Sequence, residues 1–240
     1  MIQVTPYKTS ENKKEQVRAM FNHVAHKYDF LNKLLSFGID KSWRRKTVLE
    51  LHKTNPKIVL DVATGTADLA IAASGVNASK IVGVDISENM LAVGRKKIAE
   101  KKLNSLIELQ QADSENLPFE KNYFDSVMVA FGVRNFQNLQ DGLKEMNRVL
   151  KPGGQLLVLE FSQPTKFPVK QLYSFYSRFV LPVIGNKISG DSAAYDYLPE
   201  SVKYFPSGND FASILSQCGF NKITIMPFTF GVVTLYTAFK

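Results

Sequence analysis

The sequence predicts an α/β fold, doubly wound around a mostly parallel seven-stranded sheet that ends in an antiparallel hairpin, with an N-terminal helical lid. Three observations predict this fold. From residue 57 onward, short apolar runs alternate with helix-sized segments, as in a parallel sheet covered on both faces. From about residue 11 to 53, apolar residues instead recur at helical spacing. Near the C-terminus, about three residues separate two strand-like runs, which favours an antiparallel hairpin.

The expected elements follow one another in a regular order. In the N-terminal block, Val17, Met20, Phe21 and Val24 repeat at helical spacing, so several helices precede the first strand. The expected strands are KIVLDV (57–62), KIVGVDI (80–86), SLIELQQA (105–112), FDSVMVAF (124–131), GQLLVLEF (154–161), KITIMPFT (222–229) and VVTLYTAF (232–239). The helical segments after the first strand are ADLAIAAS (67–74), SENMLAVGRKKIAEKK (87–102), LQDGLKEMNRVL (139–150), PVKQLYSFYSRFVLPVIG (168–185) and NDFASILSQCGF (209–220).

Capping and stop signals support this order. Ser87 stands where the N-cap of the helix ENMLAVGRKK belongs. The segment KPGG (151–154) ends the preceding helix because proline lacks a backbone donor and glycine tolerates the turn, and the next strand is expected directly after it. Cys218, the single cysteine, excludes an internal disulfide and is expected to be a small core residue near a helix end.

The 240 residues fit one structural domain with a helical addition. We expect residues 1–53 to form the lid and substrate segment and residues 54–240 to form the main domain, with a helical insertion at about 165–200. No stretch approaches the roughly 20 apolar residues of a spanning helix, and the N-terminus lacks the apolar core of a signal peptide, so a cytoplasmic protein is expected.

Positive charge is concentrated near the N-terminus. The net charge is +8, and residues 1–53 hold eleven Lys and Arg against five Asp and Glu, 11 − 5 = +6. Such a face is compatible with RNA, with an anionic membrane surface or with plain solvation, and charge alone does not choose among them.

The loop after the first strand, VLDVATGTADLA (59–70), resembles a nucleotide-binding turn that has kept one glycine. The three glycine positions of a dinucleotide turn are occupied here by Ala63, Gly65 and Asp68. Asp68 would put a carboxylate beside a pyrophosphate, which disfavours a dinucleotide. A cationic cofactor without phosphate, such as S-adenosylmethionine, instead favours carboxylates.

Polar residues at successive strand ends predict the contacts to this cofactor. Such residues meet at one edge of a parallel sheet, where ligands bind in this architecture. A single aspartate at a strand end is more often a helix cap or turn residue, but several in order favour a ligand site. The candidate cofactor-binding residues are Asp61, Gly65, Thr66, Asp85, Asp113 and Ser114, with Asp61 and Asp68 making the mouth negative, Asp85 binding the ribose hydroxyls and Asp113 the adenine amino group.

Longer motifs show a resemblance to a known family. The segments MFNHVAHKYDFLNKLLSFGIDKSWRRKTV (20–48), AFGVRNFQNLQDGLKEMNRVLKPGGQLLVLEFSQP (130–164) and YDYLPESVKYFP (195–206) resemble the ubiquinone/menaquinone biosynthesis C-methyltransferases, which are class I S-adenosylmethionine-dependent methyltransferases. The resemblance runs from about residue 17 to the C-terminus. Two positions depart from the pattern: Ala67 replaces a common glycine, which is tolerable if its φ is negative, and Ala130 replaces a serine and is not counted as a contact.

The resemblance implies methyl transfer to a ring carbon of a prenylated 1,4-naphthoquinol, or alternatively of a polyprenyl benzoquinol. It also implies Arg134 and Asn135 in FGVRN as residues that stabilise and orient the quinolate, and Tyr28 as a substrate-facing hydroxyl on the lid. Because arginine stays protonated in proteins, water or Asp29 would accept the proton. No metal is chemically required, and the three histidines, at positions 23, 26 and 52, offer no metal triad.

The implied substrate carries a polyprenyl tail that resides in a bilayer. The basic N-terminal block and the aromatic segment LYSFYSRFVLPVIG (172–185) could then dock on an anionic leaflet and form an apolar tunnel. The competing interpretation of the aromatic segment is a core helix or a homodimer contact.

Three other function classes are disfavoured. A base N-methylating enzyme of nucleic acids usually carries an Asp/Asn-Pro-Pro-aromatic turn after the fourth strand, where this chain has AFGVRN, so no nucleic-acid partner is expected. A hydride-transferring dehydrogenase would need the pyrophosphate turn that Asp68 opposes. A non-catalytic donor-binding protein would have no use for Arg134 and Asn135.

Overall fold

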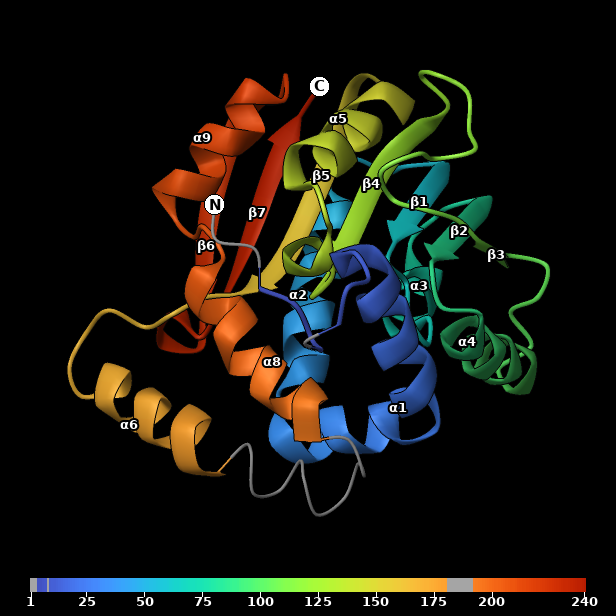
Figure 1. Ribbon diagram of the computed structural model, residues 1–240. Helices are drawn as coiled ribbons and strands as arrows, with labels where there is room; N and C mark the ends of the chain where they lie inside the picture. Colours follow the sequence, from blue (N-terminus) through green and yellow to red (C-terminus); the bar gives the residue numbers. More distant parts are fainter. Residues whose placement is uncertain (1–3, 8, 181–191) are drawn as a thin grey trace.

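The computed structural model describes residues 4–7, 9–180 and 192–240, which fold around one seven-stranded sheet (Figure 1). The strand order is β3-β2-β1-β4-β5-β7-β6. The first five strands pair in parallel, whereas β7 runs antiparallel to both β5 and β6. The strands are β1 (Ile58–Val62), β2 (Lys80–Asp85), β3 (Ile107–Gln111), β4 (Phe124–Ala130), β5 (Leu150–Phe161), β6 (Asn221–Phe228) and β7 (Val233–Phe239). The predicted fold class is confirmed.

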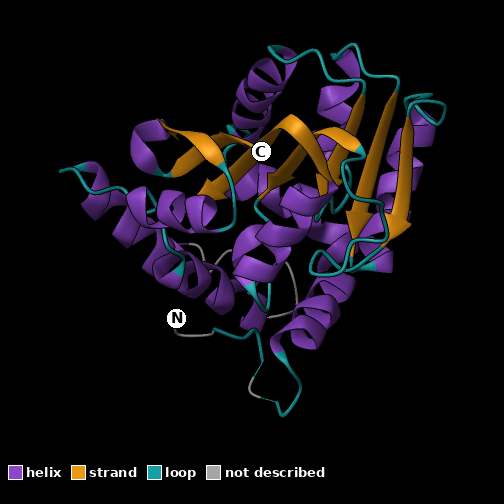
Figure 2. Cartoon of the chain, turned by 90° about the horizontal axis from the view of Figure 1, so that it is seen from above, coloured by secondary structure: helices purple, strands orange, loops and turns teal. Residues whose placement is uncertain are grey.

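Helices cover both faces of the sheet, which lies between them in Figure 2. Alternation along each strand separates the two cores: Leu60 packs with α5 residues such as Leu143 on one face, and Val59 packs with Trp43 of α2 on the other. The helices are α1 (Lys13–Leu35), α2 (Asp40–His52), α3 (Asp68–Ala72), α4 (Glu88–Glu100), α5 (Leu139–Val149), α6 (Val169–Phe175), α8 (Ser192–Tyr204) and α9 (Asn209–Gln217), with short helical turns at Ala73–Gly75, Val133–Asn135, Tyr176–Val180 and Thr229–Gly231.

The strand order reverses between β1 and β4, which are neighbours at the centre of the sheet. The connections after these two strands leave in opposite directions, so their carboxyl ends leave a crevice in which ligands bind in this architecture. In Figure 1, α1 and α8 lie together at this end of the sheet, and Val17 and Met20 of α1 pack against Tyr197 of α8. The fold therefore encloses the crevice between the sheet and helices from both ends of the chain.

The capping and stop signals hold with one difference. Ser87 caps α4, since its hydroxyl accepts a hydrogen bond from the Met90 N–H at 3.2 Å. Helix α5 ends at Val149 as KPGG predicts, but β5 already begins at Leu150 instead of after the KPGG segment. The pairing with β4 shifts register there to accommodate the turn. Cys218 is the buried C-cap of α9, as expected.

The C-terminal hairpin forms as predicted, with β6 and β7 joined by the turn Thr229–Gly231. Strand β7 lies inside the sheet between β5 and β6, which explains why six of its seven residues are buried. Strand β6 is only partly buried because it forms the edge.

Ala67 does not meet the condition expected for it. Its φ is +64°, in the left-handed region, so the expectation of a negative φ is wrong. Such a conformation costs a non-glycine residue about 1–2 kcal/mol. The turn is held by two backbone hydrogen bonds, from the Ala67 N–H to Thr64 O at 2.9 Å and from the Ile71 N–H to Ala67 O at 2.8 Å.

The N-terminal helices have different positions. Helix α2 belongs to the core beneath the sheet, where Trp43 and Leu51 are buried. Helix α1 crosses the carboxyl end of the sheet and contacts α4 and the turn Val133–Asn135. Within the described ranges, no helix is both long and apolar enough to cross a membrane.

Candidate functional site

Two adjoining cavities lie at the carboxyl end of the sheet. The first, which we call the loop cavity, measures about 70 Å³ and lies between α1 and the loops that follow β1, β2 and β3. The second, which we call the aromatic cavity, measures about 370 Å³ and is enclosed by α1, α2, α6 and α8. Four residues line both cavities: Phe21, Tyr28, Phe131 and Asn135. A reaction between two ligands, one in each cavity, would therefore take place across this shared wall.

Gly65 brings the loop after β1 against the end of β2. Its φ is +56°, and a Cβ placed on it would lie 3.3 Å from the Met90 Cε. Its N–H donates to Asp85 Oδ2 at 2.8 Å. Glycine is therefore favoured here by both conformation and space, as the single retained glycine of the motif predicts.

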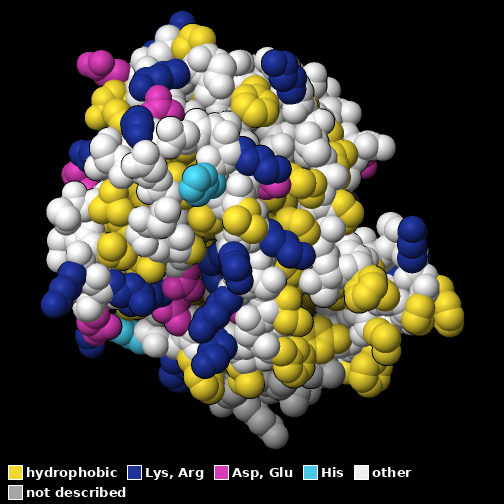
Figure 3. Space-filling model, turned by 180° about the vertical axis from the view of Figure 1, so that it is seen from behind, with side chains coloured by type: hydrophobic (Ala, Val, Ile, Leu, Met, Phe, Trp, Pro, Cys, Tyr) yellow, Lys and Arg dark blue, Asp and Glu magenta, His cyan; other side chains and the backbone are white. Residues whose placement is uncertain are grey.

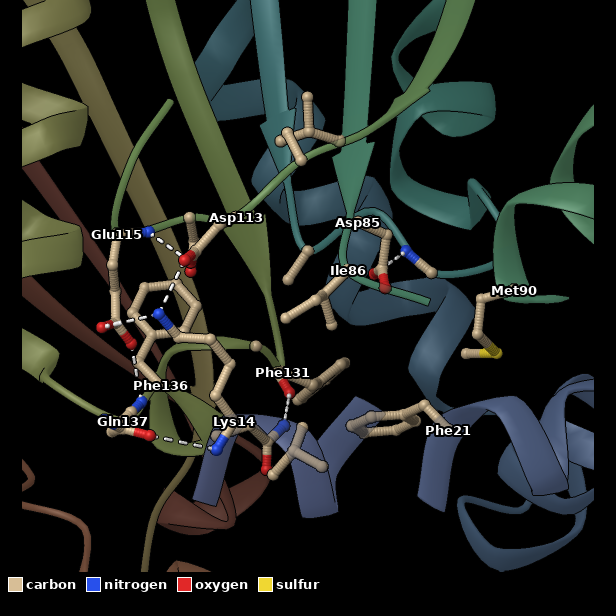
Figure 4. Close-up of a pocket in the computed structure, with 18 of the residues that line it drawn as sticks. Lys14, Phe21, Asp85, Ile86, Met90, Asp113, Glu115, Phe131, Phe136 and Gln137 are labelled. Carbon is tan, nitrogen blue, oxygen red and sulfur yellow. Dashed lines mark hydrogen bonds and ion pairs between the residues drawn. The ribbon is translucent and has the colours of Figure 1, made fainter. Parts of the chain in front are cut away.

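Asp85 ends β2 and points into the loop cavity (Figure 4). Its Oδ1 accepts from the Ser87 N–H at 2.8 Å, while Oδ2 accepts from Gly65. Burial raises the pKa of Asp85 to about 6, although backbone hydrogen bonds from Ser87 and Gly65 oppose the rise. A carboxylate offers about four acceptor sites, so Asp85 retains capacity for ligand hydroxyls.

Asp113 and Ser114 line the same cavity, where the sequence places them, but a lysine that sequence reasoning missed also lies there. Lys14 of α1 reaches Asp113 Oδ2 at 2.6 Å and Glu115 Oε2 at 3.3 Å, as Figure 4 shows. Its position in the first turn of an amphipathic helix gives no sequence signal for this contact. Asp113, the carboxylate expected to face an adenine amino group, is thus paired with Lys14 of α1.

Asp61 does not stand at the mouth of the loop cavity, so that expectation is wrong. It is 1% exposed and lines a separate inner cavity of about 30 Å³, which also contacts Gly65 and Tyr28. Its Oδ2 accepts from the Thr64 hydroxyl at 2.6 Å, but Oδ1 has no hydrogen-bond partner among the described residues. Burial raises the pKa of Asp61 to about 7.

Thr66 and Asp68 also turn away from the loop cavity and line the inner cavity instead. The Thr66 hydroxyl donates to Asp29 Oδ1 at 2.5 Å, and Lys97 bridges Asp29 at 2.6 Å and Asp68 at 2.5 Å. Arg44 adds a second cation, 3.4 Å from Asp68. The charge of Asp68 is therefore balanced by cations, and its expected role in making the mouth negative is wrong.

Arg134 lies at the wall of the aromatic cavity with its side chain 7% exposed. Its Nη1 donates to Glu160 Oε1 at 2.7 Å and to Phe131 O at 2.6 Å, and its Nε donates to Ser201 Oγ at 3.3 Å. The guanidinium carbon lies 5.4 Å from the centre of the Phe161 ring. Glu160 was missed, although a lone acid at the end of the apolar run LLVLEF repeats the pattern of Asp61 and Asp85.

Asn135 is held within the protein on both sides of its amide. Its Nδ2 donates to Phe131 O at 3.3 Å, and its Oδ1 accepts from the Tyr197 hydroxyl at 3.0 Å. Tyr28 lines all three cavities, and its burial raises the pKa of its hydroxyl. Arg134, Asn135 and Tyr28 are thus brought together at the aromatic cavity, as the motifs imply.

Asp29, the candidate proton acceptor, lines neither the loop cavity nor the aromatic cavity. Of the described residues that line the aromatic cavity, Asp40 is the single carboxylate. Burial opposes ionisation of Asp40, but hydrogen bonds from Ser36 and Arg44 outweigh it and lower its pKa. Both oxygens of Asp40 already accept hydrogen bonds, from Ser36 and Arg44, so this wall offers no free carboxylate among its described residues and water is left as the proton acceptor.

Aromatic rings give the second cavity its character. Trp43, the single tryptophan of the chain, packs edge-on against Phe131 and Phe161 at centroid distances of 6.1 and 6.2 Å. The ring centroids of Phe131 and Phe161 lie 4.5 Å apart. Such a cavity, mostly apolar but lined also by the guanidiniums of Arg44 and Arg134 and the amides of Asn32 and Asn135, suits a flat aromatic ligand that carries ring oxygens.

Comparison with known proteins gives matches over nearly the whole chain. A sequence model of the ubiE/COQ5 methyltransferase family matches residues 8–240. A Bacteroides fragilis protein named demethylmenaquinone methyltransferase is 45% identical over 238 residues, 99% of this chain and 97% of that protein. A Geobacter sulfurreducens protein named ubiquinone/menaquinone biosynthesis C-methyltransferase UbiE is 46% identical over 239 residues, 99% of this chain and 93% of that protein.

Solved structures agree with the fold. The crystal structure of an S-adenosylmethionine-dependent methyltransferase from Aquifex aeolicus matches with a TM-score of 0.62, covering 88% of this chain and 97% of that chain. Its sequence identity is 18%, so this likeness concerns the fold alone.

Proposed function

The chain belongs to the ubiE/COQ5 methyltransferase family, and from this premise we propose that it transfers a methyl group from S-adenosylmethionine to a ring carbon of demethylmenaquinol, giving menaquinol. The observation that carries the proposal is the wall shared by the loop cavity and the aromatic cavity, because methyl transfer needs donor and ring in direct line. The alternative acceptor is a polyprenyl benzoquinol, since a relative of similar identity is named for both quinones.

The residues of the loop cavity fit this donor. S-adenosylmethionine supplies an electrophilic methyl group on a sulfonium when it is bound. Gly65, Asp85, Asp113 and Ser114 would hold it, and Asp61 Oδ1 in the inner cavity, which has no hydrogen-bond partner among the described residues, would accept from its ammonium group. In this proposal Thr66 does not contact the donor directly, and its hydroxyl instead holds Asp29 of α1 over the site. Ligand pockets usually measure about 300–1,000 Å³, so α1 and Lys14 must move outward to admit the donor.

The aromatic cavity would activate and orient the acceptor. Deprotonation of the hydroxyl beside the reacting carbon makes that carbon nucleophilic, and water takes the proton. Arg134 stabilises the quinolate oxygen, and Asn135 exchanges its bond to Tyr197 for a bond to the ring. Bound S-adenosylmethionine would supply the methyl group to this carbon and keep the electron pair of the carbon–sulfur bond on its sulfur. The ring carbon would then lose its hydrogen as a proton to water.

We expect donor affinity to weaken as the pH falls. Asp61 and Asp85 have pKa values raised to about 7 and about 6, and a cationic donor needs them ionised. The Kd for S-adenosylmethionine should therefore rise from pH 7.5 downward, and by about tenfold per pH unit and per group below pH 6. Isothermal calorimetry from pH 7.5 to 5 measures this, and a constant Kd would exclude both carboxylates as donor contacts.

The stability of the ligand-free protein should change in the opposite direction. An ordinary aspartate has a pKa near 3.9, so between about pH 4 and 7 the folded chain binds protons that the unfolded chain has released. These two groups therefore make the folded state more stable as the pH falls from 7.5 to 5. Thermal melts of the ligand-free protein from pH 7.5 to 5 measure this change in stability. They also show whether a loss of donor affinity at low pH is caused by unfolding.

We propose further that a membrane surface supplies the quinol. An apolar face runs along α6 and the turn after it, where Leu172, Phe175 and Phe179 are 65%, 60% and 54% exposed. Figure 3 shows hydrophobic side chains gathered on a part of the molecule that projects from the rest. Phe37 and Leu172 are exposed and also line the aromatic cavity, so the cavity opens beside this apolar face. A polyprenyl tail could pass from the cavity into lipid along this face.

The double substitution Phe175→Glu and Phe179→Glu should lower binding to anionic liposomes by about tenfold or more, because it places two charges in the apolar contact. Tyr123→Glu, at the opposite end of the sheet, is the matched control. Co-sedimentation measures binding, and equal binding of both variants would reject the membrane face. Sedimentation velocity on the same variants tests the competing homodimer contact.

The proposed function is tested with demethylated naphthoquinol and benzoquinol side by side, with S-adenosylmethionine and mass detection of the ring. We expect methylated naphthoquinol as the main product. Quenching of Trp43 fluorescence by the oxidised quinones reports occupancy of the aromatic cavity independently of turnover. An enzyme that binds the donor but methylates neither ring would disprove the proposal.

A further inference from the structure

Glu160 is the last residue but one of β5, next to the aromatic cavity, and is completely buried. Its Oε1 accepts from Arg134 Nη1 at 2.7 Å and from the Phe161 N–H at 2.8 Å, and its Oε2 faces the Arg134 N–H at 3.4 Å. Glu160 thus contacts both the side chain and the backbone of one arginine, and does not itself line the cavity. Strand β5 thereby fixes a residue of the loop after β4.

The remaining contacts of Arg134 divide its guanidinium into two sides. Phe131 O, in the loop after β4, accepts from Nη1, and Ser201 Oγ of α8 accepts from Nε. The Nη2 group, by contrast, donates to no atom of the residues that the structure describes. Nη1 and Nε of the guanidinium are therefore held by β5, the loop after β4 and α8, and Nη2 remains as a donor for a ligand oxygen.

A contribution to stability alone does not explain this pair. Two opposite charges buried together recover little more than the cost of removing them from water, and apolar residues of equal volume are often as good. The Glu145–Arg148 pair shows the cheaper arrangement, partly exposed on α5 and outside the lining of both cavities. A fully buried glutamate whose partner stands at a ligand cavity is better explained by the orientation that it imposes.

Building on the proposed function, we propose that Glu160 is a positioning residue for methyl transfer, which holds the Arg134 guanidinium so that Nη2 meets the quinolate oxygen. Glu160 also compensates part of the arginine charge, which lets the guanidinium stay desolvated before the acceptor ionises. The residue touches neither substrate, and its effect on the rate passes entirely through Arg134.

The test compares E160Q with E160D and with E145Q as the matched control. E160Q removes the charge and should lower kcat by about 30-fold or more, while the donor Kd and quinone quenching of Trp43 stay within about threefold. E160D keeps the charge on a shorter side chain and should recover most of the lost rate. E145Q, which breaks an ion pair far from the cavities, should match the wild type.

A double-mutant cycle decides whether Glu160 acts through Arg134. In the R134K background the fork is already lost, so E160Q should reduce kcat no further than about threefold. Independent, multiplicative losses would overturn the inference, as would wild-type turnover by E160Q. Equal losses of melting temperature, donor affinity and kcat in both E160Q and E160D would overturn it as well, in favour of a structural role. If the wild type methylates no quinol, the proposed function fails first and the inference falls with it.

Discussion

Replacing Arg134 by lysine should lower the rate of methyl transfer about 100-fold while the affinity for S-adenosylmethionine stays within about threefold. Lysine keeps the positive charge and can still pair with Glu160, so the fold is expected to survive. It loses the planar fork, however, and one ammonium cannot bind Glu160, Phe131 O and a quinolate oxygen in the same geometry. The substitution should therefore lower the rate of the methyl-transfer step itself.

Single-turnover kinetics with saturating donor and quinol measure this step, and calorimetry measures donor affinity. Arg148→Lys is the matched control, because Arg148 also pairs with a glutamate but lies away from both cavities. Turnover of the Arg134 variant near that of the wild type would remove Arg134 from the mechanism. A parallel loss of donor affinity would show instead that the loop after β4 had been disturbed.

Replacing Asp85 by asparagine should raise the Kd for S-adenosylmethionine about 100-fold and leave kcat at saturating donor within about fivefold. The carboxylate would accept hydrogen bonds from both ribose hydroxyls, and a hydrogen bond to a charged group contributes about 1.5–3 kcal/mol. Asparagine removes the charge and turns one acceptor into a donor. This binding is shared by ground and transition states, so its loss appears in affinity.

Asp125→Asn is the matched control for this substitution. Asp125 also accepts from two backbone N–H groups, those of Lys57 and Ile58 at 2.9 and 2.8 Å, but it lies at the other end of the central strands. Its variant should bind the donor within about threefold of the wild type. An unchanged Kd in the Asp85 variant would exclude Asp85 as a donor contact.

The backbone arrangement followed from local patterns. Buried parallel strands appear as apolar runs because both faces are covered, and Gly65 and Asp85 occur where strand ends demand a turn and an acceptor. The family motifs identified the family, which the match over residues 8–240 confirms. Properties that depend on a few consecutive residues were therefore predictable.

Side-chain partners were not predictable, because each pair joins distant parts of the chain. Lys14 meets Asp113 across 99 positions, and Thr66 meets Asp29 across 37. The expected negative mouth failed for this reason: the sequence shows carboxylates but not the cations that tertiary contacts bring to them. The expectation of a negative φ at Ala67 failed for a different reason, because tertiary packing overrode the local preference of alanine.

The position of α1 has a consequence for the catalytic cycle. One helix supplies Phe21 and Tyr28 to the wall between the cavities, while Lys14 and Asp29 fasten it to the loops of the donor side. We expect neither S-adenosylmethionine nor its demethylated product to leave the loop cavity while those ion pairs hold. Product release and reloading thus share a single opening event, and its frequency sets an upper limit on turnover.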